Sequence, residues 1–113
     1  MRSMRLSEFL ELASRWQQDS SALWVLFACG GESDSFASAV KTVGNASFTL
    51  AKEGKKDVSV ELLPGTTSWE GLPSEASSDL RGESISRFER VVELRVPTSA
   101  GPAVFAIFEI KAQ

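Results

Sequence analysis

The chain has 113 residues, a net charge of −3 at pH 7, 42% hydrophobic residues and 24% charged residues. These values are typical of one globular domain with its own hydrophobic core, and they count against both a disordered chain and a membrane protein. The basic residues alternate with acidic ones and never form a run longer than two. This argues against nucleic acid as a partner, because phosphate binding needs a basic patch.

Histidine and tyrosine are both absent, and there is a single cysteine, Cys29. Without histidine the chain can form neither a Ser-His or Cys-His nucleophile pair nor a His-rich metal site. One cysteine cannot form a disulfide within the chain, which fits a reducing compartment. We therefore expect a cytoplasmic protein that holds no metal and no cofactor, and we favour a non-catalytic role while leaving enzyme activity open.

Residues 5–18 predict an amphipathic helix, with Ser7 as a candidate N-cap. Its polar face is not rich in lysine and arginine, as the face of a membrane-surface helix would be, so we expect no membrane contact. The helix should instead lie over a sheet. The apolar side chains at helical spacing are Leu6, Phe9, Leu10, Ala13 and Trp16.

The next segment, residues 22–29, is apolar on both alternating faces, which predicts a strand covered on both sides. It ends in Cys29, which is followed by Gly30–Gly31. The apolar run is short for a secretion signal and acidic residues precede it, so we expect no lipid attachment at Cys29. No histidine or adjacent cation could activate the thiol. We therefore expect Cys29 to be a small, buried structural residue at the end of a strand.

A series of short strands with tight turns should follow. Residues 36–43 fit either a helix or a strand, and we favour a strand because Gly44–Asn45 is typical of a hairpin turn. Residues 47–52 and 58–62 alternate between apolar and polar side chains, as half-buried strands do.

Residues 64–84 break this alternation and predict a long irregular connection, within which 74–81 could form a turn or two of helix. Connections of this length are often functional. Trp69 lies in this polar segment. It is either a plug on the core or an anchor for a partner or ligand, because a lone tryptophan suits both roles.

The chain should close with a long hairpin formed by residues 85–96 and 103–111. Residues 103–108 are apolar on both faces, so either the helix or a second copy of the chain must cover the additional apolar face. In strict alternation Arg90 shares the inward face with Phe88 and Val92. Either a bulge turns Arg90 outward, or it lies at a pocket or partner surface where it can bind a carboxylate.

Together these elements predict a single α+β domain over residues 1–113. Its N-terminal amphipathic helix packs on a strongly curved antiparallel sheet, or on a small barrel, of five to six strands built from a meander and the C-terminal hairpin. No motif in the chain points to a family, and an outline of this kind does not by itself indicate a function.

Two functions fit this outline. The first is a small non-catalytic binding or interaction module that associates with itself through a sheet edge or the two-sided hairpin. The alternative is a single-chain roll that binds a small apolar or anionic ligand between helix and sheet, in a pocket walled by Trp16, Trp24 and Phe108, with Arg90 for polar recognition. The residues that we expect to bind the ligand or partner are Trp16, Trp24, Trp69, Arg90, Phe105 and Phe108.

Overall fold

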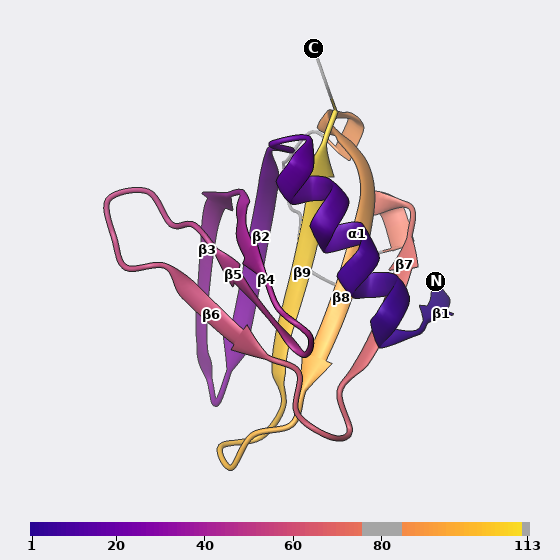
Figure 1. Cartoon of the computed structure of the whole chain (residues 1–113). Helices are drawn as coiled ribbons and strands as arrows, with labels where there is room; N and C mark the ends of the chain where they lie inside the picture. Colours follow the sequence, from indigo (N-terminus) through magenta and orange to yellow (C-terminus); the bar gives the residue numbers. More distant parts are fainter. Residues whose placement is uncertain (76–84, 112–113) are drawn as a thin grey trace.

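In a computed structural model, which describes residues 1–75 and 85–111, the chain forms one α-helix and two antiparallel β-sheets (Figure 1). This confirms the predicted α+β class. The helix, α1, spans Leu6–Gln18, and two short 3₁₀ turns lie at Pro73–Glu75 and Ile85–Arg87.

The larger sheet has six strands and the smaller sheet has three. Across the larger sheet the order is β1 (Arg2–Met4), β7 (Thr67–Gly71), β8 (Phe88–Val96), β9 (Ala103–Ile110), β2 (Leu23–Cys29) and β3 (Glu32–Ser38). Across the smaller sheet it is β4 (Val40–Val43), β5 (Ser47–Leu50) and β6 (Val58–Glu61). Strands β1 and β3 are the two edges of the larger sheet and do not pair with each other, so the barrel alternative does not form.

Helix α1 and the smaller sheet both cover one face of the larger sheet, which we call the inner face (Figure 1). The main core lies between these two layers. Burying a large apolar side chain stabilises the fold by about 1.5–3 kcal/mol, so this layer supplies much of the driving force for folding. Its fully buried members include Phe9, Leu23, Val25, Phe48, Leu50, Leu94 and Ile107.

The helix follows the predicted amphipathic pattern, with Phe9 and Trp16 buried against the sheets. The Phe9 ring meets Phe48 of the smaller sheet edge to face, with ring centroids 5.1 Å apart. The N-cap is Arg5, whose backbone N–H donates to Glu8 Oε1 at 3.2 Å. Ser7 therefore lies inside the helix and is not its cap.

The opposite, outer face of the larger sheet carries a second apolar cluster. Trp24, Leu26 and Ile110 pack at its margin. Strand β9 is thus buried on both faces within one chain, with Phe105 facing the main core and Phe108 facing the outer cluster. The buried members of the outer cluster are Phe88, Val91, Ala106 and Phe108.

Residues 36–43 are strand, as we favoured, but they are divided between two sheets. Strand β3 ends at Ser38 and β4 begins at Val40, so the chain passes from the larger to the smaller sheet at Ala39. In the following turn the Gly44 N–H donates to the Ser47 carbonyl oxygen at 2.8 Å. The turn is therefore centred one residue later than the predicted Gly44–Asn45 pair.

The predicted irregular connection contains a strand. Within it, β7 pairs with β8 and with β1. The sequence did not indicate β7 because most side chains of this strand are polar. Ser68 is buried, and its hydroxyl donates to the Met4 carbonyl oxygen at 2.9 Å. Of the helical turn predicted over 74–81, residues 76–81 lie outside the described residues.

A bulge interrupts the pairing of β8 with β9 between Phe88 and Arg90. An extra residue in one strand reverses the alternation of faces. Phe88 therefore joins the outer cluster, whereas Val92 lies in the main core, and the prediction that they share a face was wrong. The bulge leaves Arg90 on the inner face, beside the edge of the helix layer, rather than turning it outward.

Replacing Phe105 with aspartate should unfold the chain rather than release a soluble monomer, because Phe105 is only 5% exposed in the main core. Burial of an unpaired charge there should cost at least about 3–5 kcal/mol. The matched control is Val104→Asp on the half-exposed outer side of the same strand, which should cost clearly less. Urea unfolding measures both, and equal stabilities of the two variants would contradict this packing.

Candidate functional site

A cavity of about 230 Å³ lies between the larger and the smaller sheet, near the end of the β2–β3 hairpin. The larger sheet contributes residues from β2, β3 and β9. The smaller-sheet layer contributes Val58 of β6 and Lys52, which follows β5. The complete lining is Phe27, Glu32, Ser33, Asp34, Phe36, Lys52, Val58 and Phe105.

The strand register brings the aromatic side chains of the cavity together. Phe27 lies opposite Phe105 on one side and opposite Asp34 on the other. The rings of Phe27 and Phe105 are tilted by 46°, with centroids 4.9 Å apart. Since alternate residues of a strand share a face, Asp34 and Phe36 both point toward this inner side. The cavity therefore has an aromatic wall.

The β2–β3 register depends on the two-residue turn Gly30–Gly31. Both glycines have positive φ, 59° and 85°, which is the conformation of a type I′ hairpin turn. Residues with side chains rarely adopt it. The turn fixes Cys29 opposite Glu32. This pairing sets the register of the remaining residue pairs of the hairpin, including Phe27 with Asp34. Cys29 itself is half-buried at the end of β2, with Sγ 3.8 Å from Thr98 Oγ1.

Charged groups form the rim of the cavity. Lys52 Nζ makes an ion pair with Asp34 Oδ2 and also lies 4.8 Å from the centroid of the Phe36 ring. The Lys52 side chain is 19% exposed, whereas that of Asp34 is 48% exposed. The second carboxylate at the rim, Glu32, makes no ion pair within the described chain.

The hydrogen bond from Lys52 lowers the pKa of the Asp34 carboxyl. The Ser35 backbone N–H, which donates to Asp34 Oδ1 at 2.8 Å, and the charge of Lys55 lower this pKa further. Asp34 is therefore ionised at neutral pH. With an aromatic wall and a charged rim, the cavity has the composition of a small-ligand site.

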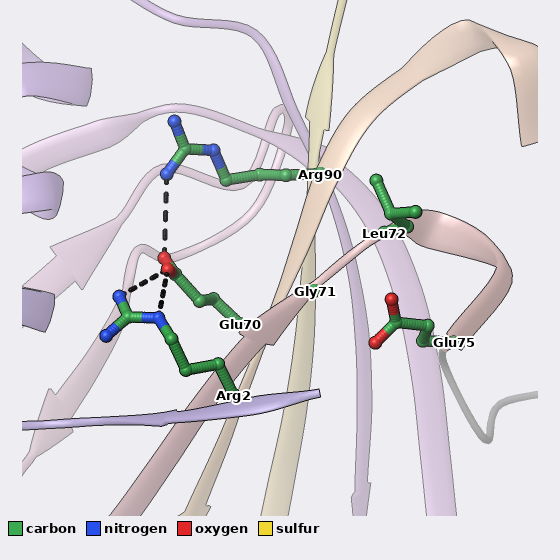
Figure 2. A pocket seen from close by; sticks show the side chains of 6 residues that line it. All are labelled: Arg2, Glu70, Gly71, Leu72, Glu75 and Arg90. Carbon is green, nitrogen blue, oxygen red and sulfur yellow. Dashed lines mark hydrogen bonds and ion pairs between the residues drawn. The ribbon is translucent and has the colours of Figure 1, made fainter.

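A second group of charged residues lies on the inner face near the β1 edge (Figure 2). Figure 2 shows the charged ends of Arg2, Glu70 and Arg90 pointing toward one another, while Leu72 and Glu75 lie apart from them, beyond Gly71. Arg2 Nε donates to Glu70 Oε1 at 2.9 Å, and Arg90 Nη1 lies 3.7 Å from Glu70 Oε2. This group borders an open hollow of about 470 Å³.

Arg90 is held by carboxylates of its own chain. Besides Glu70, its Nε lies 3.2 Å from Glu109 Oε2, and Trp16 Nε1 donates to the same oxygen at 2.9 Å. Such cross-strand pairs and networks fix neighbouring strands to one another. The network therefore joins β7, β8, β9 and the helix, and its guanidinium groups already have anionic partners.

The structure does not bring the three predicted pocket walls together, although Trp16 and Arg90 meet at the Glu109 carboxylate. Trp16 lies in the main core under the helix, whereas Trp24 and Phe108 are paired neighbours on the opposite face of the sheet. Trp69 is half-buried on β7, where it pairs with Ser3 and Glu93. Of the six predicted residues, Phe105 is the one that lines the cavity between the sheets.

Sequence reasoning missed the rest of the cavity lining. Phe27 and Phe36 have the character of ordinary core residues, and Lys52 and Asp34 that of ordinary surface residues. One available signal was the Gly30–Gly31 turn, since a two-residue hairpin fixes the register and would have placed Phe27 opposite Asp34. No comparable signal connects Lys52 or Val58 to the hairpin.

The pKa of the Asp34 carboxyl should rise toward its usual range in Lys52→Met, as measured by NMR titration. Because this pKa is lower in the folded protein than in the unfolded chain, the ion pair stabilises the fold at pH values above the unfolded-state pKa of about 3.9. That stabilisation is lost as the pH falls through the lower, folded-state value. Lys56→Met is the control and should leave Asp34 unchanged, since Lys56 does not contribute to the shift. Identical pKa values in Lys52→Met and wild type would contradict the pairing.

Three further findings bear on this site. Within residues 1–75 and 85–111, no group of three or more Cys, Asp or Glu side chains is placed to hold a metal ion. In the same part of the chain, no helix has the length and apolar character needed to span a membrane. Comparison of the chain with protein-family models, with curated proteins and with solved structures finds no match.

Proposed function

We propose that this chain is a small non-catalytic binding module that takes a small, largely apolar ligand into the cavity between its two sheets. The observation that carries the proposal is the wall of Phe27, Phe36 and Phe105 around a cavity of about 230 Å³. Ligand sites are concave and mainly apolar, with a few polar groups at defined places, and this cavity fits that description.

The energetics of packing support an occupant. Protein interiors are close-packed, and side chains beside a void lose dispersion contacts on one side. A ligand seated among the rings would restore these contacts and bury the half-exposed Phe27. Drug-sized ligands use cavities of roughly 300–1,000 Å³, so this smaller cavity suits a compact molecule, such as one with a single ring.

Self-association is the second candidate function. The first reason to expect it was that β9 is apolar on both faces. This reason is weakened, because both faces of β9 are buried within one chain. The remaining reason is an exposed edge of the larger sheet, of which β3, with seven residues, is longer than β1, with three. However, the Ser35 N–H on β3 is already bonded to the Asp34 carboxylate, and charges on an edge strand oppose pairing with another chain. The cavity is therefore the better-supported site.

The proposal predicts that 2-phenylethanol, a neutral single-ring probe, binds the full chain and raises its melting temperature. At ten times its dissociation constant the probe should add about 1.4 kcal/mol to the free energy of unfolding. Val58→Phe should abolish this effect, because the larger side chain fills the cavity. The control Val104→Phe, on the outer face, should leave the effect unchanged. The absence of any stabilisation, or equal stabilisation of the two variants, would contradict the proposal.

Native mass spectrometry tests the second candidate separately. If the chain binds the probe as a monomer, the ligand-binding function stands alone. If the chain forms a dimer through the β3 edge, Ser35→Pro should release monomers. The substitution removes a backbone N–H of the edge strand that makes no hydrogen bond to β2. The geometry of a two-residue hairpin places this N–H on the outward side of β3. A dimer that survives Ser35→Pro would show that association does not use the β3 edge.

A further inference from the structure

We infer that the ligand of this cavity is a small apolar amine, whose ammonium group binds at the carboxylate rim while its apolar body lies against the phenylalanine rings. The inference rests on the proposed function and adds the chemical class of the ligand.

The side chains of the cavity lining carry an excess of one negative charge, and Lys55, whose charge also acts on Asp34, lies outside the lining. The lining contains two carboxylates, Glu32 and Asp34, and one ammonium group, Lys52. The alternation of β3 places both carboxylates on the inner side, opposite Cys29 and Phe27 respectively. A singly charged amine would bring the lining to neutrality, with Glu32 available to pair with it. A ligand anion would instead add a second uncompensated negative charge.

Lys52 shows that the rim can hold an ammonium group. Its Nζ is paired with the Asp34 carboxylate and lies over the Phe36 ring at 4.8 Å from the centroid. A carboxylate together with an aromatic face is the combination that binds ammonium groups, because the ring face and the anion both attract positive charge. The chain therefore supplies its own cation at this position, and a ligand amine must share Asp34 with it.

This competition has opposite consequences for the two classes of charged ligand. If the ligand is an amine, replacing Lys52 with methionine removes a competing cation while keeping an apolar side chain beside Phe36, so binding becomes tighter. If the ligand is an anion, Lys52 is its binding partner and the same replacement weakens binding. The sign of the effect of Lys52→Met therefore identifies the class.

The experiment compares three probes of similar shape: 2-phenylethylamine, 2-phenylethanol and 3-phenylpropionate. Their affinities for the full chain are measured by NMR titration at neutral pH and low ionic strength, where rim charges are least screened. The proteins are wild type, Lys52→Met, Glu32→Gln and the control Lys56→Met. The retained pattern of amide signals establishes that each variant is folded.

We expect the amine to bind wild type about three- to fivefold more tightly than the alcohol, as the energies of exposed ion pairs allow. Lys52→Met should tighten amine binding about threefold, and Glu32→Gln should weaken it by a similar factor. Because the alcohol carries no charge, the ratio of amine affinity to alcohol affinity in each variant isolates the effect of the rim charges. Lys56→Met should bind all three probes as wild type does.

Three results would overturn the inference. If the alcohol binds as tightly as the amine, the ligand class is wrong while the proposed function stands. If the propionate binds most tightly and loses affinity in Lys52→Met, the ligand is an anion and the cavity still binds. If none of the three probes binds, the proposed function fails and the inference fails with it.

Discussion

The burial of strand β9 on both of its faces is the constraint from which the two-layered fold follows. Phe105 and Ile107 must be covered on one side of the sheet, and Ala106 and Phe108 on the other. A single helix cannot cover the inner face of a sheet of six strands. The chain therefore leaves the larger sheet at Ala39 and forms β4, β5 and β6, which complete the inner layer beside α1.

The cavity is a consequence of this arrangement. The helix packs closely through Phe9 and Trp16, but the smaller sheet reaches the hairpin end through Val58 and Lys52. Side chains of this size do not fill the space in front of Phe27 and Phe105. Lys52 has a long stem that can lie along an aromatic surface with its charge at the rim. One residue thus both borders the aromatic wall and sets the charge balance that would select a ligand.

Much of the fold could be predicted from the sequence because its long elements carry strong periodic signals. The helical spacing of Phe9 and Trp16, and the two-sided apolar character around Val25 and Ile107, are properties of local sequence. The short strand β1 and the polar strand β7 carry no such signal, since Ser68 is buried only because it meets Met4 across the sheet. Similarly, the bulge before Arg90 is set by tertiary pairing and reversed the face predicted for Phe88.

The candidate site was harder to predict than the fold. Bulky and aromatic side chains suggested Trp16, Trp24 and Phe108, but the sheet separates the first from the other two. A cavity depends on which side chains fail to fill the space between two layers, and residue type does not determine this. The pairing of Lys52 with Asp34 joins two sheets and has no trace in local sequence.

The most direct test of the central claim is to locate a bound probe by intermolecular NOEs between 2-phenylethanol and the isotope-labelled chain. We predict NOEs to the rings of Phe27, Phe36 and Phe105 and to the methyl groups of Val58, all of which line the cavity between the sheets. NOEs confined to Trp24 and Phe108 would place the probe on the outer face of the larger sheet. That result would contradict the account given for this cavity.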